Sequence, residues 1–171
     1  MTIQEFQAYC CSMSNTVIIY YSLEGNVDYI AKLLAVKTGA DLIRLETVKE
    51  YPKKGLLKFI TGGCDAMFGI RPALKNALPD FDQFSTIIIG TPVWAGKLSA
   101  PINTFLHKTK IKGKRIALFA CCAGGQTEKC FNKMKQQLSE NTILTCDTFI
   151  NPMQNEGYTV TRKADMIASK L

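Results

Sequence analysis

Short runs of consecutive apolar residues alternate along this chain with longer stretches in which apolar residues recur every three or four positions. The runs from Val17 to Tyr21 and from Ile87 to Ile89 contain no strongly polar residue. Such runs are typical of strands that are buried on both faces of a sheet. The longer stretches have the period of helices that bury one face. This alternation predicts an α/β protein whose helices cover a parallel sheet.

The expected elements follow one another from about residue 15 to the C-terminus. Strands are predicted at residues 17–21, 41–46, 86–90, 114–120 and 142–150, the last one mainly in the later half of its segment. Helices are predicted between them from the following residues: Val27, Ile30, Ala31 and Leu34 before Gly39; Leu56, Leu57, Phe59 and Ile60 before a turn or kink at Gly62 and Gly63; Ile102, Phe105 and Leu106 after Ser99; Phe131, Met134 and Leu138 after Thr127; and Ala164, Ile167, Ala168 and Leu171. These elements predict a three-layer α/β sandwich with a five-stranded parallel sheet of order 2-1-3-4-5.

The chain of 171 residues fits one domain, which we expect to span residues 13–171. Residues 1–12 are expected to form a disordered extension, because Met13 stands just before the first strand and looks like a natural start. The apolar runs are too short to span a bilayer, and the first residues lack the pattern of a signal peptide. Seven cysteines without a CxxC pair disfavour a disulfide framework and a zinc site, and they favour a reducing cytoplasmic location.

The segments that follow the first, third and fourth strands are rich in small residues. They read SLEGN at 22–26, TPVWAG at 91–96 and CCAGG at 121–125. In open α/β sheets, ligands bind at the carboxyl ends of the strands where the strand order reverses, which is here between the first and third strands. We therefore expect the three segments to line one ligand site.

The first of these segments leads directly into a helix and has the features of an anion cradle. The first N–H groups of a helix lack an intrahelical partner, and the helix dipole places partial positive charge there. Gly25 allows close approach of the backbone, and Ser22 and Asn26 offer side-chain hydrogen bonds, so a terminal phosphate is the expected guest. The alternative is an ordinary strand-to-helix turn that binds nothing, because a single turn of this kind is a weak signal.

Four other side chains have more than one interpretation. The single tryptophan, Trp94, is either a core or lid aromatic, or a flat wall on which a planar ring stacks. Cys121 and Cys122 could exchange electrons with a redox ligand, but we favour small hydrophobes that close a buried strand. His107 is expected to be a surface or packing residue, so we nominate no catalytic residue.

The net charge of +7 indicates a surface that attracts anions. The basic residues gather at 108–115 and at 49–58, and we favour solvated loops as their role. No nucleic-acid recognition motif accompanies the charge, so nucleic acid is not an expected partner.

The motifs YYSLEGNVDYIAKLL and IIIGTPVWAGKLSAPINTFL, with the Gly-Gly loop after the fourth strand, resemble those of flavodoxins and flavodoxin-like oxidoreductases. The resemblance runs from about Asn15 to the C-terminus and implies non-covalently bound FMN as the cofactor. It implies three groups of FMN-binding residues: Ser22, Leu23, Glu24, Gly25, Asn26 and Val27 at the phosphate; Thr91, Pro92, Val93, Trp94, Ala95 and Gly96 on one side of the isoalloxazine; and Cys122, Ala123, Gly124 and Gly125 on its other side.

Three features depart from the flavodoxin pattern. Glu24 and Val27 stand where many flavodoxins carry threonine, so the cradle has fewer hydroxyl donors, and a carboxylate beside the phosphate is unfavourable unless it points away. The segment after the fourth strand has no aromatic residue, so one flavin face is expected to be open. The net charge of +7 also contrasts with the acidic character of carrier flavodoxins.

These observations leave three functions open. The first is an FMN electron carrier that transfers electrons between redox partner proteins. The second is an FMN-dependent reductase that takes hydride from NAD(P)H and passes it to a quinone or similar small acceptor, although no GxGxxG motif accompanies the flavin site. The third is a flavodoxin-shaped interaction module without a cofactor, which only Glu24 and Val27 support.

Overall fold

The structure is a computed structural model that describes residues 15–52, 57–155 and 157–171, with the side chains of residues 57–61 left out of the description. The predicted extension, residues 1–12, therefore lies outside the described residues. So do Lys53 and Lys54 of the second basic segment and the side chain of Lys58.

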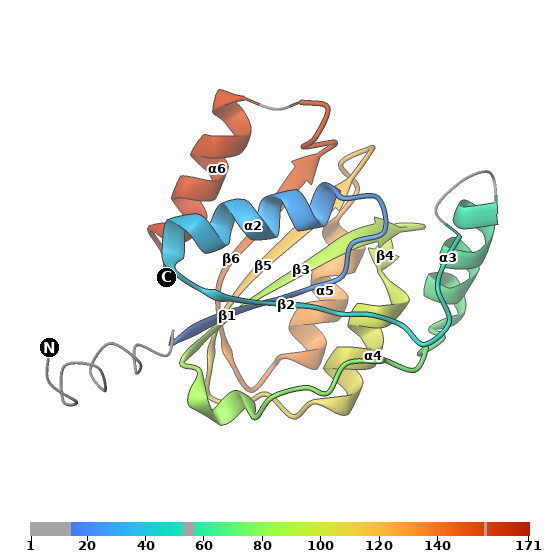
Figure 1. The fold of residues 1–171 in the computed structure, drawn as a ribbon, viewed down its shortest axis with the longest axis horizontal. Helices are drawn as coiled ribbons and strands as arrows, with labels where there is room; N and C mark the ends of the chain where they lie inside the picture. The colour runs from blue at the N-terminus through green and yellow to red at the C-terminus, as the bar shows by residue number, and fades with distance from the viewer. Residues whose placement is uncertain (1–14, 53–56, 156) are drawn as a thin grey trace, which may run out of the picture.

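Five parallel strands form the central sheet (Figure 1), in the order β2-β1-β3-β5-β6. Their bounds are Thr16–Tyr20 for β1, Asp41–Arg44 for β2, Thr86–Trp94 for β3, Arg115–Cys122 for β5 and Thr142–Ile150 for β6. The short strand β4, Lys97–Leu98, pairs antiparallel with the end of β3. Counted without β4, the parallel strands have the order 2-1-3-4-5, and the predicted topology is confirmed.

Helices cover both faces of this sheet, as predicted (Figure 1). One face is covered by α2 (Asn26–Thr38) and α6 (Tyr158–Ala168), and the other by α4 (Ala100–Lys108) and α5 (Glu128–Gln137). Neighbouring residues of one strand point to opposite faces. Ile18 accordingly packs in the core on the α2 side, Ile19 packs in the core on the α4 side, and both are fully buried. The result is the predicted three-layer sandwich.

The third helix, α3 (Leu57–Phe68), lies at one side of the sheet, apart from α2 and α6 (Figure 1). The prediction of a helix in this long connection is confirmed, but no turn ends it at Gly62 and Gly63, because both glycines lie inside the helix. A Cβ atom on Gly62 would lie 3.2 Å from the indole of Trp94. The missing side chain at this position thus lets the helix lie directly against Trp94.

The third strand also differs from the prediction, since it continues beyond Gly90 to Trp94. Ala95 and Gly96, with φ of 48° and 74°, then form a two-residue turn that leads into β4. Both residues have the positive φ that tight hairpins of this kind require. The segment expected to be an open loop is therefore a hairpin, which fixes the position of Trp94.

Smaller differences concern the strand ends. β5 includes Cys121 and Cys122, which were expected to lie in the following loop, and β6 fills its whole segment. β2 ends at Arg44 rather than at Glu46. A short 3-10 helix, η1 (Phe81–Gln83), precedes β3 and buries Phe81. None of these differences changes the order of the strands.

Candidate functional site

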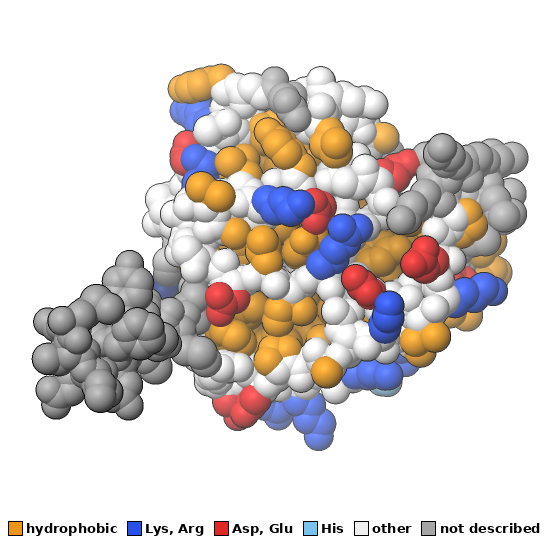
Figure 2. All heavy atoms as spheres, in the orientation of Figure 1, with side chains coloured by type: hydrophobic (Ala, Val, Ile, Leu, Met, Phe, Trp, Pro, Cys, Tyr) orange, Lys and Arg blue, Asp and Glu red, His pale blue; other side chains and the backbone are white. Residues whose placement is uncertain are grey.

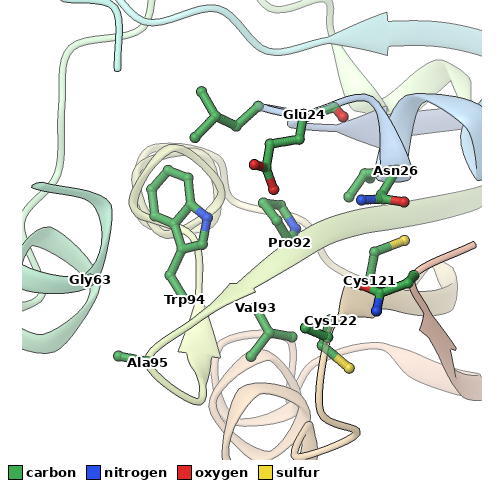
Figure 3. Close-up of a pocket in the computed structure, with 14 residues that line it drawn as sticks. Glu24, Asn26, Gly63, Pro92, Val93, Trp94, Ala95, Cys121 and Cys122 are labelled. Atoms are coloured by element: carbon green, nitrogen blue, oxygen red, sulfur yellow. The ribbon is translucent and has the colours of Figure 1, made fainter. Parts of the chain in front are cut away.

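A cavity lies at the carboxyl ends of β1, β3 and β5, where the strand order reverses (Figure 3). Segments far apart in the sequence meet in it, as the sequence predicted. The residues predicted to bind a ligand that line this cavity are Ser22, Leu23, Glu24, Asn26, Val27, Pro92, Val93, Trp94, Ala95, Cys122 and Ala123.

Five other predicted residues, Gly25, Thr91, Gly96, Gly124 and Gly125, are not part of the cavity lining. Thr91 is fully buried, and its hydroxyl lies 3.1 Å from the Ser99 hydroxyl and accepts a hydrogen bond from the Ser99 N–H. Thr91 thereby fastens the start of α4 to β3. Gly96 and Gly125 line a neighbouring hollow instead.

The structure adds Gly63 and Asn151 to the lining, together with Cys121, which lies in the expected segment 121–125 but was not among the residues implied to bind FMN. Asn151 follows β6 with a positive φ of 41°, and its N–H donates to the carbonyl of Cys122 at 3.0 Å. Asn-Pro at residues 151–152 is a turn signal that could have marked this position. No comparable signal exists for Gly63, because the packing of α3 against β3 brings it to the cavity.

The turn between β1 and α2 has the backbone of an anion cradle. Gly25 occupies the N-cap position with a φ of 100°, and its N–H donates to Ser22 Oγ at 3.2 Å. The first intrahelical hydrogen bond runs from the Tyr29 N–H to the Gly25 carbonyl at 2.8 Å. The N–H groups of residues 26–28 precede this bond and lie at the positive end of the helix dipole, so the turn suits an anion such as a phosphate.

Met153, in the connection between β6 and α6, packs against the outer side of this turn. Its N–H donates to Asn26 Oδ1 at 3.3 Å, and a Cβ atom on Gly25 would lie 3.0 Å from its sulfur. Asn26 therefore lines the cavity and also holds the β6–α6 connection. The left-handed φ of Gly25 favours glycine at this position, and the Met153 side chain would also have to shift to admit a Cβ atom.

Asp28, in the first turn of α2, has its charge balanced by neighbouring groups. The Tyr20 hydroxyl donates to Asp28 Oδ1 at 2.7 Å, Lys32 Nζ lies 2.8 Å from Oδ2, and Arg44 Nη1 lies 3.6 Å from Oδ1. Burial alone would raise the pKa of Asp28, but the hydrogen bonds from Lys32 and Tyr20, together with the two positive charges, hold it below its ordinary value. This carboxylate is therefore ionised and locally neutralised, which limits its repulsion of an anion at the helix start.

Glu24 lies on the inner side of the same turn. Its carboxylate is directed into the cavity, toward Trp94 and Pro92 (Figure 3). The sequence left open whether this group points away from the site, and the structure directs it inward. Such a carboxylate repels a nearby phosphate, but it also accepts hydrogen bonds from the hydroxyl or N–H groups of a ligand.

Trp94 stands between the cavity and two buried tyrosines. Its ring centroid lies 5.0 Å from that of Tyr51 and 5.7 Å from that of Tyr21, with the Tyr21 ring nearly perpendicular at 87°. Gly62 of α3 lies against the indole, whose nitrogen-bearing edge is directed toward the cavity (Figure 3). Trp94 is thus a packing aromatic and part of the cavity wall at the same time.

The two tyrosines keep this wall uncharged and attach it to α3. The Tyr51 hydroxyl donates to Asp65 Oδ2 of α3 at 2.6 Å. Burial raises the pKa of Tyr51 far above its ordinary value, and the hydrogen bond to Asp65 raises it further. Burial also raises the pKa of Tyr21 to about 12. Both phenols are therefore neutral at physiological pH.

Small residues form the opposite side of the cavity, at the end of β5. Burial raises the pKa of the Cys121 thiol well above its ordinary value, so this thiol remains protonated and behaves as the small hydrophobe that we favoured. Cys122 is half-buried, and its Sγ accepts a hydrogen bond from the Gly125 N–H at 3.1 Å. Cys121, Cys122 and Ala123 thus line one side of the cavity with small side chains, and the aromatic ring of Trp94 lines the opposite side.

Other kinds of site receive no support from the part of the chain that the structure describes. No group of histidine, cysteine and carboxylate side chains in this part could hold a metal ion. None of its helices is both long enough and apolar enough to cross a membrane. His107 is exposed at the end of α4 and does not line the cavity, in keeping with a surface role.

Comparisons with known proteins agree with this architecture. A flavoprotein from Lactobacillus acidophilus, crystallised in complex with FMN, matches with a TM-score of 0.69 at 19% identity, over 82% of this chain and 96% of that chain. A protein from Bacteroides uniformis matches with a TM-score of 0.72 at 20% identity, over 88% and 97% of the two chains. Two-electron reduced flavodoxin from Megasphaera elsdenii matches with a TM-score of 0.54 at 18% identity, over 90% and 98%.

At these identities the solved structures establish a common fold. The evidence for kinship comes from the sequence profile of the family described as Flavodoxin, which matches residues 15–158. This match covers most of the chain and includes all three segments that meet at the cavity. The chain belongs to the flavodoxin family.

Proposed function

We propose that this protein binds FMN non-covalently in the cavity at the carboxyl edge of its sheet and transfers electrons through it. One observation carries the proposal: the N-terminal turn of α2 and the aromatic wall at Trp94 face the same cavity. A phosphate and a planar ring are the two parts of FMN that such an arrangement suits. The FMN complex of the related fold from Lactobacillus acidophilus supports the choice of cofactor.

The residues present fit the phosphate at the start of α2. The N–H groups of residues 26–28 and the Ser22 hydroxyl supply hydrogen bonds, and the helix dipole supplies positive potential. Val27 is buried in the core beside Ile30, so this residue contributes its backbone N–H and not a side-chain hydroxyl. Because position 27 carries valine where many flavodoxins have threonine, the phosphate is expected to lose one side-chain hydrogen-bond donor there.

The remaining cavity residues would hold the ring. Trp94 and Pro92 exclude water from one side, while Cys122 and Ala123 approach the other with small side chains. When bound, FMN supplies the chemistry itself, because its ring accepts and returns electrons. The protein contributes binding, orientation and an uncharged aromatic wall.

A titration of the apoprotein with FMN, riboflavin and FAD tests this proposal. We expect FMN to bind most tightly, with riboflavin weaker by about tenfold or more, because charge-assisted hydrogen bonds to the phosphate are worth roughly 1.5–3 kcal/mol. FAD should bind less tightly than FMN, because its adenylate would have to pass the Ser22–Asn26 turn. Equal affinities for FMN and riboflavin would refute the phosphate role of that turn.

An FMN-dependent reductase is the second candidate function. It is favoured by the small side chains of Cys122 and Ala123, which leave room for a substrate on one face of the ring, and by the net charge of +7, which attracts phosphate-bearing nicotinamide nucleotides. Steady oxidation of NADPH or NADH by the FMN-loaded protein with a quinone would support the reductase. Electron exchange with redox proteins alone would support the carrier.

A further inference from the structure

Two hollows lie beside the cavity, next to β4 and α5. Ala95 lines both the cavity and a neighbouring hollow, which also includes Lys129. Lys129 in turn lines a second hollow between α3 and α5. We call this second hollow the α3–α5 groove, which is formed by Met67, Phe68, Lys97, Leu98, Lys129 and Lys133 among others. The shared residues place the cavity, the neighbouring hollow and the α3–α5 groove next to one another on the surface.

One wall of the α3–α5 groove is apolar and exposed. Phe68 is 74% exposed and Met67 is 56% exposed, and Ile70, just after the helix, is 48% exposed. In Figure 2, hydrophobic side chains reach the surface at the α3 end of the molecule beside basic ones. Exposed apolar side chains that gather in this way mark interaction sites in soluble proteins.

The exposed wall is held in place by hydrogen bonds. Lys97 Nζ donates to the carbonyl of Met67 at 2.9 Å, and Asn103 Nδ2 donates to the carbonyl of Gly69 at 3.4 Å. The Ile70 N–H donates to the Asp65 carbonyl at 2.8 Å. The end of α3 is therefore fastened to β4 and α4, and Phe68 is displayed from a fixed backbone.

The other wall of the groove is basic. Lys97, Lys129 and Lys133 are exposed, and no aspartate or glutamate is among the described residues that line the groove. Glu128 is the only carboxylate among the described residues that line the hollow between the groove and the cavity. A partner that fits must bring negative charge to the lysines and an apolar group to Phe68.

We propose that the α3–α5 groove is the docking site of an acidic redox protein that exchanges electrons with FMN in the adjoining cavity. This proposal rests on the proposed function. A second copy of this chain would bring like charge to the groove, because the chain carries +7 overall. The concave shape suits a ridge on a protein surface better than a flat anionic membrane. In this exchange the reduced partner would lose one electron and be oxidised, and the bound FMN would gain that electron and be reduced.

The test uses a reduced plant-type ferredoxin as an acidic one-electron probe. Its affinity for the FMN-loaded protein is measured by titration calorimetry, and its electron transfer to FMN by stopped-flow absorbance. The charge variant is Lys129→Glu with Lys133→Glu, and the apolar variant is Phe68→Ser. The matched control is Lys108→Glu with Lys110→Glu, which changes the net charge equally at two exposed residues at and just beyond the C-terminal end of α4, outside the groove.

We expect the charge variant to bind ferredoxin about tenfold more weakly than the control does, because like charges then face each other at the contact. The affinity of the native protein should also fall between roughly 0.01 and 0.1 M salt, over which the Debye length shrinks from about 30 to 10 Å. Phe68→Ser should weaken binding at both salt concentrations, because it removes an apolar contact.

Equal losses in the charge variant and its control, full affinity in Phe68→Ser, or no binding of ferredoxin would each overturn the proposal. Sedimentation with phosphatidylserine vesicles that depends on Lys129 and Lys133, without ferredoxin binding, would assign the groove to a membrane instead. The apoprotein is titrated in parallel. If the FMN-loaded protein does not bind ferredoxin, the docking proposal fails and the proposed FMN binding stands. If the protein does not bind FMN, the proposed function fails, and the apoprotein titration still measures docking.

Discussion

Gly90 on β3 lies directly opposite Phe119 on β5, and a Cβ atom on Gly90 would lie 2.2 Å from Phe119 Cζ. The Phe119 ring fills the space that any side chain at position 90 would need. The ring is fully buried and packs edge to face against Phe149, with centroids 6.2 Å apart. Gly90 is therefore required by packing between neighbouring strands, because its own φ is not in the left-handed region.

Gly90→Ala is expected to destabilise the protein by about 3 kcal/mol, because the methyl group would clash with a ring that is fully buried and packed against Phe149. Urea unfolding of the apoprotein would measure this loss. Phe119→Leu in the Gly90→Ala background should restore part of it, since the smaller side chain makes room for the methyl group. Native stability in Gly90→Ala alone would mean that β3 and β5 are not packed as described.

Gly62 and Gly63 provide a matched pair inside α3. Among the residues that the structure describes, a Cβ atom on Gly63 would meet nothing within 4 Å, whereas one on Gly62 would lie 3.2 Å from the Trp94 indole. Gly63→Ala should stabilise the protein by roughly 0.5–1 kcal/mol through helix propensity. Gly62→Ala should gain less than this or lose stability, and it should shift the tryptophan emission, because it displaces Trp94. Identical effects in the two variants, measured by urea unfolding, would contradict the contact between α3 and Trp94.

Trp94 provides a direct spectroscopic report on the cavity, because it is the only tryptophan in the chain. We expect its fluorescence to be quenched when FMN binds. Trp94→Ala should weaken FMN binding by about 1–3 kcal/mol, the range for stacking of aromatic side chains on bases. The variant should also lose stability without FMN, because Trp94 packs against Tyr21 and Tyr51. Unchanged fluorescence at saturating FMN would place the ring away from Trp94.

Glu24 is expected to oppose the phosphate, because its carboxylate is directed into the cavity. Glu24→Thr should tighten FMN binding by at most about 1 kcal/mol, since the side chain is exposed to solvent. It should leave riboflavin binding unchanged, because riboflavin has no phosphate. Glu140→Thr, at an exposed residue between α5 and β6, controls for net charge. Weaker binding of both flavins to Glu24→Thr would instead make Glu24 a hydrogen-bond acceptor for the ligand.

Asp28 makes stability sensitive to acid. Its pKa is lower in the folded protein than the ordinary value of 3.8, so folding favours the ionised form. The resulting stabilisation is present above that ordinary value and is lost as the pH falls through the lower folded pKa. Asp28→Asn should therefore cost about 1–3 kcal/mol near pH 6 and less near pH 3. Urea unfolding at the two pH values would measure this, and an equal cost at both would contradict the ion pairs with Lys32 and Arg44.

The strands and the first helix could be predicted because their signals are local. The apolar runs at 17–21 and 87–89 mark strands wherever they occur, and Gly39 ends α2 through its own left-handed φ of 68°. The three segments at the cavity followed from the strand order and the switch-point rule. Predicting these parts of the fold requires no knowledge of contacts between residues far apart in the sequence.

The errors concern residues whose conformation depends on a distant neighbour. Two adjacent glycines favour a break in a helix by propensity, yet Gly62 remains helical where it meets Trp94, which lies 32 residues further along the chain. The lining residue Gly63 comes from a helix whose place depends on tertiary packing, whereas Asn151 had a local turn signal that the prediction did not use. The groove between α3 and α5 was beyond prediction for the same reason.

The contact of Gly62 with Trp94 also has a thermodynamic consequence. Gly62 supports the cavity wall and Phe68 lines the α3–α5 groove, and both belong to one helix of 12 residues, so a displacement at one is carried to the other. If the proposed cofactor and the proposed partner favour the same placement of α3, each must strengthen the binding of the other by the same factor. A partner would then distinguish the cofactor-loaded protein from the empty one by its affinity for the α3–α5 groove.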